Sequence, residues 1–314
     1  MPFAVVFPGQ GSQSVGMLAG LADGSEVVAD TIAEASEALG FDLGNLLREG
    51  PAEELNRTEN TQPALLAAGI AVWRLWMERG GTQPAVLAGH SLGEYTALAA
   101  AGAIAFTDAL RLVRQRGLFM QEAVPEGVGA MAAIIGLDAQ TVTRLCSEAG
   151  SEGTVSAANF NSPAQIVISG QRAAVEKARG LAEAAGAKRV IPLAVSVPSH
   201  CGLMRPAAER LAAELSALEL VTPAIPVVNN ADVAAPQEAQ VIADALVRQL
   251  TQSVRWTETV LSLRDDFGAQ AVFEFGPGQV LTGLGKRIDR RFPGQAVNDT
   301  ASLEKALEAA KDFS

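Results

Sequence analysis

Histidine, tyrosine and cysteine are rare in this sequence of 314 residues, which holds two histidines, one tyrosine and two cysteines. The two cysteines, Cys146 and Cys201, cannot form a disulfide framework, and they do not have the spacing of a metal site. A reducing environment suits such a chain, so we expect a cytoplasmic protein that holds no metal.

Basic residues are also in deficit. The chain has 24 lysines and arginines against 35 acidic residues, which gives a formal net charge of −11. A general nucleic-acid-binding protein needs a basic face, so this charge argues against that class, although it leaves room for a local basic patch.

Long apolar runs are missing as well. The longest run of small apolar residues, 97–106, is interrupted by Gly102 and is much shorter than a membrane span. The segment at the N-terminus carries no basic leader, and its apolar run is too short for a signal peptide. We therefore expect no membrane insertion and no export.

Apolar residues make up 48% of the chain and charged residues 19%, which is typical of a globular α/β protein. Short apolar segments alternate with longer amphipathic ones over most of the sequence. The segments predicted as strands are 3–7, 85–88, 225–228 and 271–275. The segments predicted as helices are 25–39, 62–79, 92–101, 107–121, 203–218, 238–250, 256–266 and one that ends near 290.

The pattern changes between residues 130 and 193. There we predict strands at 130–135, 154–159, 165–169 and 188–193, and helices at 138–149 and 171–185. The resulting order, β-α-β-β-α-β, is that of a ferredoxin-like unit. It predicts a small lobe inserted into a larger α/β domain.

The segment Gly89-His90-Ser91-Leu92-Gly93 fits the pattern G-x-S-x-G, with a predicted buried strand before it and a predicted helix after it. A serine on so sharp a turn lies in strained backbone, and side chains at 89 and 93 would collide with neighbouring elements. The turn exposes the hydroxyl near the positive end of a helix, where backbone N–H groups can stabilise an oxyanion. We therefore predict that Ser91 is a nucleophile.

A serine nucleophile of this kind needs a base, and the chain offers two histidines. His90 directly precedes the serine, so its ring should point away from the hydroxyl, which leaves His200 as the candidate base. With an ordinary pKa of about 6.5, it would be half-protonated close to neutral pH. No aspartate or glutamate stands out as its orienting partner, so a backbone carbonyl or an amide is expected in that role.

Arg116 lies on the apolar face of a predicted helix. Leu112 precedes it by four positions and Phe119 follows it by three, so its aliphatic stem shares a face with apolar side chains. A buried guanidinium needs an anionic partner. The spacing alone leaves open whether that partner is a structural carboxylate or the carboxylate of a substrate.

The segment Gly276-Pro277-Gly278 also follows a predicted strand and precedes a predicted helix. It lacks the glycine spacing of a dinucleotide-binding loop and the lysine-serine pair of a phosphate-binding loop. We interpret it as a tight structural turn.

Several segments together resemble the malonyl-CoA:acyl carrier protein transacylases of bacterial fatty-acid synthesis. The resemblance extends from the first predicted strand to residues 275–278, so it covers nearly the whole chain. The matching segments are 7–13 (FPGQGSQ), 89–95 (GHSLGEY), 115–117 (QRG), 159–163 (NFNSP), 197–200 (VPSH) and 248–250 (RQL).

The resemblance implies a fold and a role for each site residue. The fold is α/β: an α/β-hydrolase-like main domain, formed by residues 1–126 and 196–314, with an inserted ferredoxin-like subdomain, residues 127–195. The implied active site lies between the two. The implied roles are Ser91 as nucleophile, His200 as base, Gln10 and the backbone N–H of Leu92 as oxyanion hole, Arg116 as ligand of the malonyl carboxylate, and Gln249 as the residue that positions the site and orients His200, largely through its backbone.

The resemblance also implies the reaction and the partners. The malonyl group would pass from malonyl-CoA to the phosphopantetheine thiol of acyl carrier protein through a malonyl-serine intermediate, with a coenzyme A thioester as substrate and no bound cofactor. We expect a monomer. Carrier proteins of this type are acidic, so docking would rely on local basic pairs, for which the candidates are 188–189, 286–287 and 290–291.

Three other functions stay open. An esterase or thioesterase would use the same elbow with water as the acceptor. A non-catalytic scaffold or carrier-binding subunit would need neither Ser91 nor His200. An acyltransferase that serves polyketide assembly would use the same chemistry, and its sequence would look the same.

Overall fold

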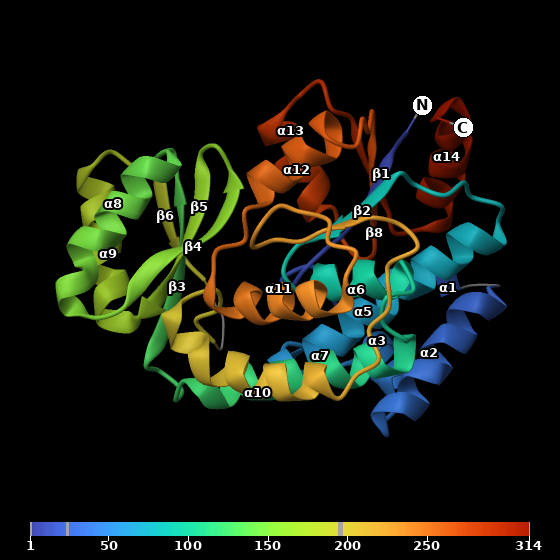
Figure 1. Cartoon of the computed structure of the whole chain (residues 1–314), viewed down its shortest axis with the longest axis horizontal. Helices are drawn as coiled ribbons and strands as arrows, with labels where there is room; N and C mark the ends of the chain where they lie inside the picture. Colours follow the sequence, from blue (N-terminus) through green and yellow to red (C-terminus); the bar gives the residue numbers. More distant parts are fainter. Residues whose placement is uncertain (1, 23–24, 194–196, 314) are drawn as a thin grey trace.

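The computed structural model describes residues 2–22, 25–193 and 197–313. These residues form a five-stranded sheet with its covering helices, called here the main lobe, and a four-stranded sheet with two helices, called the small lobe. The small lobe lies at the left of Figure 1 and the main lobe at its right. The predicted α/β class with a second, smaller sheet is confirmed.

The sheet of the main lobe is parallel, with strand order β7-β2-β1-β8-β9. Phe7 pairs with Gly89, so the first two strands end level with each other. Because the strands are parallel, the segments that follow them lie at the same edge of the sheet. This edge, at the carboxyl ends of the strands, is where such sheets carry their ligand-binding groups. The strands are β1 (Ala4–Phe7), β2 (Val86–Gly89), β7 (Val227–Val228), β8 (Val272–Phe275) and β9 (Gly294–Val297).

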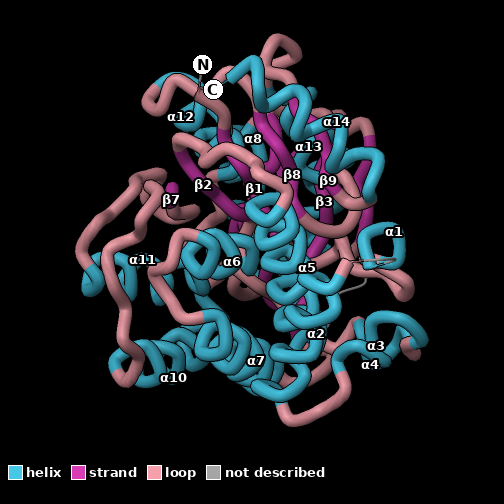
Figure 2. Tube along the Cα trace, turned by 90° about the vertical axis from the view of Figure 1, so that its right-hand side faces the viewer, coloured by secondary structure: helices cyan, strands magenta, loops and turns pink. Residues whose placement is uncertain are grey.

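Helices cover both faces of this sheet because successive strand residues point in opposite directions. Val5 and Phe7 pack into the larger core with α2, α5, α6 and α7, whereas Ala4 and Val6 pack against α12 and α13. Figure 2 shows α5 and α6 lying across the strands. The helices of the main lobe are α1 (Ala19–Ala22), α2 (Glu26–Leu39), α3 (Leu43–Glu49), α4 (Ala52–Leu55), α5 (Thr58–Glu78), α6 (Leu92–Ala100), α7 (Phe106–Ala123), α10 (Arg205–Ser216), α11 (Ala239–Thr251), α12 (Trp256–Asp265), α13 (Val280–Ile288) and α14 (Thr300–Ala310).

The small lobe has the predicted order of elements. Its antiparallel sheet has strand order β4-β5-β3-β6, and both helices pack on one face of it. The other face carries Met131, Ala133, Ala158 and Val167. The elements are β3 (Gly129–Ile135), α8 (Ala139–Ala149), β4 (Val155–Ser162), β5 (Gln165–Gln171), α9 (Arg172–Ala184) and β6 (Arg189–Pro192).

The boundaries 127 and 195 of the small subdomain stay a prediction. The second boundary, between 195 and 196, lies outside the described residues.

Two predicted limits of the main lobe are wrong. Helix α5 begins at Thr58, not at residue 62, and contains Pro63. A proline this close to the start removes only one hydrogen bond, which the long buried face of the helix offsets. The lobe does not close after α13: β9 adds a fifth strand beside β8, and α14 follows it, begun by a capping box between Asp299 and Ser302.

No helix in the described part of the chain is long and apolar enough to cross a membrane.

Candidate active site

Ser91 lies on the sharp turn between β2 and α6. Its backbone has φ 52° and ψ −105°, which is a strained conformation for a residue other than glycine. A Cβ atom on Gly89 would lie 1.9 Å from the carbonyl carbon of Gly93, and one on Gly93 would lie 2.0 Å from the carbonyl oxygen of Phe7. The two glycines are therefore required by close backbone contacts, as the sequence predicts.

Asn230 holds this turn in place. Its Oδ1 accepts a hydrogen bond from the backbone N–H of Ser91 at 2.6 Å, and its Nδ2 donates to the carbonyl of Gly89 at 2.7 Å. These bonds tie the segment after β7 to the segment after β2, which stabilises the strained serine. No motif in the sequence assigns Asn230 a role in the site.

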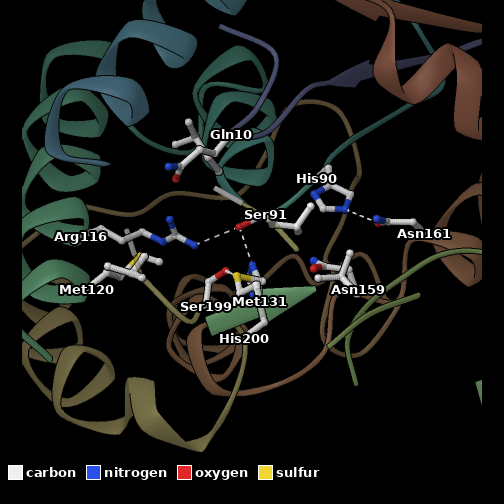
Figure 3. A pocket seen from close by; sticks show the side chains of 14 residues that line it. Gln10, His90, Ser91, Arg116, Met120, Met131, Asn159, Asn161, Ser199 and His200 are labelled. Carbon is white, nitrogen blue, oxygen red and sulfur yellow. Dashed lines mark hydrogen bonds between the residues drawn. The ribbon is translucent and has the colours of Figure 1, made fainter. Parts of the chain in front are cut away.

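His200 is in hydrogen-bonding contact with Ser91. Its Nε2 lies 2.7 Å from the Oγ of Ser91 (Figure 3). Its Nδ1 lies 2.8 Å from the carbonyl oxygen of Gln249. A carbonyl can only accept, so Nδ1 carries the proton and Nε2 is left to accept the proton of the serine hydroxyl. This is the arrangement of a nucleophile and its base, with a backbone carbonyl as the orienting partner.

The environment of His200 changes its protonation. The side chain is 3% exposed, and burial together with the nearby charge of Arg116 lowers its pKa from 6.5 to about 3. The expectation of a half-protonated histidine at neutral pH is therefore wrong, because the ordinary pKa assumes a solvated ring. His200 is neutral at neutral pH and available as a base.

Arg116 lies beside the serine on helix α7. It is 1% exposed, and Leu112 and Phe119, which share its predicted face of the helix, are buried in the core. Its Nη2 lies 3.2 Å from the Oγ of Ser91. Arg116 is thus a fully buried cation in contact with the hydroxyl of Ser91.

The partners of this guanidinium are neutral. Nη1 donates to Oε1 of Gln62 at 2.8 Å, and Nη2 donates to Oε1 of Gln249 at 3.0 Å. Among residues 2–22, 25–193 and 197–313, no salt bridge includes Arg116. In the described residues no carboxylate therefore contacts the guanidinium directly, and the buried acid Glu94 is joined to it only through the amide of Gln249. The charge can bind an anion that enters the site.

Gln10 and Leu92 face the same space as Ser91. Leu92 is the first residue of α6, so its backbone N–H has no helical carbonyl partner. Gln10 follows β1 and is exposed, with its Nε2 at 3.5 Å from the Oγ1 of Thr58. Both residues line one cavity together with Ser91 and Arg116.

This cavity has a volume of about 170 Å³ and lies between the two lobes. Its main-lobe wall consists of Gln10, His90, Ser91, Leu92, Arg116, Met120, Val197, Ser199 and His200. Its small-lobe wall consists of Met131, Asn159, Asn161, Val167 and Leu193. Gln249 lies behind the main-lobe wall, fully buried. The structure therefore brings all six predicted site residues together.

Comparison with known proteins decides the family. Residues 4–299 match the family of acyl transferase domains. The chain is 56% identical to the malonyl CoA-acyl carrier protein transacylase of Escherichia coli (strain K12) over 306 residues, which cover 98% of this chain and 99% of that protein. The chain belongs to the malonyl-CoA:acyl carrier protein transacylase family. The family predicted from the motifs is confirmed, and so is the enzyme class, an acyltransferase.

Other members of this transacylase family match over equally long stretches. The protein of Bacillus subtilis (strain 168) is 46% identical, with 98% of this chain and 97% of that protein covered. The crystal structure of an acyl carrier protein S-malonyltransferase from Vibrio cholerae has a TM-score of 0.95 and 56% identity, covering 98% of this chain and 100% of that one. A malonyl-transacylase in complex with the holo form of its type II polyketide synthase acyl carrier protein has a TM-score of 0.97 and 58% identity, with the same coverage.

The second histidine of this transacylase family member points away from the serine, as predicted. The Nε2 of His90 lies 2.8 Å from Oδ1 of Asn161, and its ring packs near Trp256, with 5.5 Å between the ring centroids. Burial lowers the pKa of His90. Figure 3 shows the ring of His90 directed toward Asn161, whereas the ring of His200 is hydrogen-bonded to Ser91.

The glycine-rich segment 276–278 is a structural turn, as predicted. Both oxygens of the buried Glu274 carboxylate accept from the first turn of α13, from Leu281 N at 3.0 Å and Thr282 N at 2.7 Å. The chain's own carboxylate thus occupies the helix N-terminus where a phosphate would bind.

Three residues of the site are not predicted from the sequence: Gln62, Glu94 and Asn230. Asn230 could have been identified from its position just after the predicted strand 225–228. In the structure this strand pairs with β2, with Val228 opposite Ala88. Glu94 lies within the segment 89–95 that carries the family resemblance, but the sequence gives it no role. Gln62 has no signal, because only the packing of α5 on α7 brings it to Arg116.

Proposed function

We propose that this chain transfers a malonyl group from malonyl-CoA to the phosphopantetheine thiol of acyl carrier protein through a malonyl-serine intermediate. The observation that carries the proposal is the position of Arg116, a buried cation without an ionic partner among the described residues, 3.2 Å from a serine that contacts a neutral histidine. The enzyme is an [acyl-carrier-protein] S-malonyltransferase that supplies malonyl groups for fatty-acid synthesis.

In the first step the Oγ of Ser91 attacks the thioester carbonyl of malonyl-CoA while its proton passes to Nε2 of His200. The tetrahedral intermediate carries its negative charge on the former carbonyl oxygen, which accepts hydrogen bonds from the N–H of Leu92 and the amide of Gln10. When the carbon–sulfur bond breaks, coenzyme A leaves as a thiol that takes the proton from His200. A malonyl ester of Ser91 remains.

The second step runs the same chemistry in reverse. His200 takes the proton of the carrier's thiol, the sulfur attacks the ester carbonyl, and the same oxyanion hole stabilises the intermediate. Collapse breaks the bond to the Oγ of Ser91, which regains its proton from His200. The neutral form of His200, favoured by its low pKa, is the form that each step needs at its start.

Arg116 binds the free carboxylate of the malonyl group in both steps. A guanidinium can hold a carboxylate with two parallel hydrogen bonds, which fixes the direction of the acyl chain as well as its charge. An acetyl group lacks this carboxylate. We infer that this contact selects malonyl over acetyl and orients the ester so that attack by a thiol outruns attack by water.

Intact mass spectrometry tests the proposal. The purified chain mixed with malonyl-CoA should gain one malonyl group and lose it on addition of holo acyl carrier protein, whereas Ser91→Ala should gain none. Hydrolysis at the same rate with and without the carrier would indicate a thioesterase instead. Absence of any adduct would support the non-catalytic scaffold.

We also propose where the carrier docks. The basic pairs 188–189, at the beginning of β6 in the small lobe, and 286–287, on α13 of the main lobe, are exposed. Arg189 is paired with Ile135, Ile135 is paired with Gln165, and Arg287 of α13 donates a hydrogen bond to the side chain of Gln165. In the third basic pair, 290–291, Arg291 forms an ion pair with Asp289. The surface that we propose for the carrier is therefore the one formed by 188–189 and 286–287.

The double variant Lys286→Glu/Arg287→Glu should raise KM for the carrier at least tenfold and leave KM for malonyl-CoA unchanged. The exposed Lys305 on α14 offers a matched control, Lys305→Glu, which should change neither constant. A KM for the carrier that does not respond to ionic strength would contradict an electrostatic interface.

A polyketide carrier is the second candidate acceptor. The observation in its favour is the similarity to the malonyl-transacylase that was solved with a type II polyketide synthase carrier. The ratio of kcat/KM for the two holo carriers decides between them. Cytoplasmic location and a monomeric state stay predictions, which fractionation and sedimentation would test.

A further inference from the structure

Glu94 is a buried acid that takes no part in the mechanism above. It is 2% exposed and lies in the first turn of α6, three residues after the nucleophile. Its Oε2 accepts two hydrogen bonds, from Nε2 of Gln249 at 2.7 Å and from the backbone N–H of Asn230 at 2.8 Å. Both donors belong to residues that contact the reacting groups.

We propose that Glu94 is a positioning residue that sets the preference for malonyl over acetyl by fixing which end of the Gln249 amide faces Arg116. The inference rests on the proposed role of Arg116 as ligand of the malonyl carboxylate. Glu94 would act through Gln249, since its own hydrogen bonds are to Gln249 and Asn230 and not to the serine hydroxyl.

The two ends of the Gln249 amide face different kinds of partner. Its Nε2 donates to Oε2 of Glu94 at 2.7 Å and to the carbonyl of Ser91 at 3.0 Å, and both of these partners accept. Its Oε1 accepts from Nη2 of Arg116 at 3.0 Å. A flipped amide would turn its NH₂ group toward the guanidinium, so that two donors would face each other, and its oxygen toward two acceptors.

The acceptor on Glu94 is present in both of its protonation states. Burial raises the pKa of this carboxyl to about 7, Arg116 opposes the rise and Asp232 adds to it. The oxygen that Gln249 and Asn230 share accepts whether or not the other oxygen carries a proton. A glutamine at position 94 keeps such an oxygen, so Glu94→Gln is the conservative variant.

Removal of the Glu94 carboxylate would have two effects, one through Asn230 and one through Gln249, and a measurement can separate them. The backbone of Asn230 donates to Glu94, and the side chain of Asn230 supports the N–H of Ser91. Weaker support of the serine lowers transfer of every acyl group by the same factor. Misplacement of Arg116 lowers transfer of malonyl alone, so the malonyl-to-acetyl ratio isolates the proposed role.

The experiment measures kcat/KM for malonyl-CoA and acetyl-CoA, with holo acyl carrier protein as acceptor. In Glu94→Ala we expect the malonyl-to-acetyl ratio to fall roughly tenfold, mainly through a higher KM for malonyl-CoA, because a hydrogen bond that supports a charged group is lost. In Glu94→Gln we expect the ratio to stay within roughly threefold of the parent value. An unchanged ratio in folded Glu94→Ala would overturn the proposal, since a merely structural role lowers both activities together.

Two further variants keep the test decisive. If Glu94→Ala does not fold, Gln249→Leu removes the bond to Glu94 together with the bonds of Gln249 to Arg116 and to the Ser91 carbonyl, and keeps the backbone carbonyl that His200 needs. A fall in the ratio at least as large is then expected, and no fall overturns the proposal. Arg116→Ala separates the two inferences. An unchanged ratio in Arg116→Ala defeats the proposed role of Arg116, whereas a lower ratio there with an unchanged ratio in Glu94→Ala defeats the role of Glu94 alone.

Discussion

The two walls of the cavity differ in chemistry. The main-lobe wall carries a cation, a hydroxyl and an imidazole that hydrogen-bond to one another, since Ser91 contacts both Arg116 and His200. The small-lobe wall consists of Met131, Val167 and Leu193 with two asparagine side chains, and none of these residues is charged. Reactivity is therefore concentrated on one lobe, while the other supplies shape and neutral hydrogen-bonding groups.

The two walls also differ in the interactions that hold their side chains in place. Buried amides and a buried carboxylate stand behind the main-lobe wall, where they fix side-chain directions through bonds of 2.6–3.0 Å. Most residues of the small-lobe wall project from the strands β3, β4 and β5, and the wall has fewer such bonds: Oδ1 of Asn161 lies 2.8 Å from Nε2 of His90. Substitutions on the main-lobe wall are expected to change rates by orders of magnitude, and those on the small-lobe wall by small factors.

Ser91→Ala gives the largest expected effect. Removal of the nucleophile should lower kcat/KM for malonyl transfer by at least about 10⁴-fold, because the acceptor thiol then has to react with malonyl-CoA directly. A radioactive transfer assay measures this. If Ser91→Ala kept more than a hundredth of the activity, Ser91 would not be the nucleophile. The proposed concentration of reactive groups on the main-lobe wall would then be wrong.

Arg116→Ala ranks next. If Arg116 pairs with the substrate carboxylate as proposed, its loss should lower kcat/KM for malonyl-CoA about 10²-fold and leave acetyl transfer intact or improved. Arg111 on the same helix is exposed and paired with Asp108, so Arg111→Ala is the matched control and should behave like the parent. Equal losses with both thioesters would contradict the selectivity role.

Asn230→Ala sharpens the comparison within the main-lobe wall. This side chain supports the backbone of the nucleophile, not the acyl group. Its loss should lower kcat/KM about tenfold for malonyl-CoA and acetyl-CoA alike, because buried polar partners are left unpaired. A loss confined to malonyl-CoA would assign Asn230 to selectivity instead.

Met131→Leu tests the small-lobe wall. The two side chains have similar volumes, so kcat/KM should stay within about threefold for both thioesters. Circular dichroism confirms that the variant is folded. A change of more than tenfold would show that this wall takes part in the chemistry.

The dependence on pH gives the smallest expected effect. The depressed pKa of His200, about 3, means that its neutral form persists as the pH falls and is lost only near that value. Between pH 7.5 and 5.5 the kcat/KM for malonyl-CoA should fall less than twofold, whereas a histidine with a pKa of about 6.5 would lose about tenfold. In Arg116→Ala, assayed with acetyl-CoA, the acid limb should move to higher pH, because the cation that disfavours the imidazolium is gone.

The sequence predicts those parts of the site that local pattern determines. The elbow around Ser91, the scarcity of histidine and the apolar face of Arg116 are all visible within a few residues. Gln62 and Glu94 are not, because their partners lie 54 and 155 positions away and only tertiary packing joins them. The low pKa of His200 depends on burial and on the charge of Arg116 on α7, neither of which the sequence reports.

The same limit applies to the fold. The predicted order of elements in the small lobe is found, because its strands and helices alternate clearly. Strand β9 reads Gly-Gln-Ala-Val, which has too few apolar residues to signal a strand, and its pairing with β8 is a long-range contact. Helix α5 extends four residues before its predicted start, because its interactions with the rest of the lobe outweigh the signal of Pro63.

The group that orients the imidazole of His200 is the main-chain oxygen of Gln249, an atom that every amino acid carries. No codon change at position 249 can therefore delete it, and only a shift of the end of α11 would withdraw it. An orienting aspartate side chain, by contrast, could be lost through a single amino-acid substitution. The backbone carbonyl that orients His200 cannot be lost in that way.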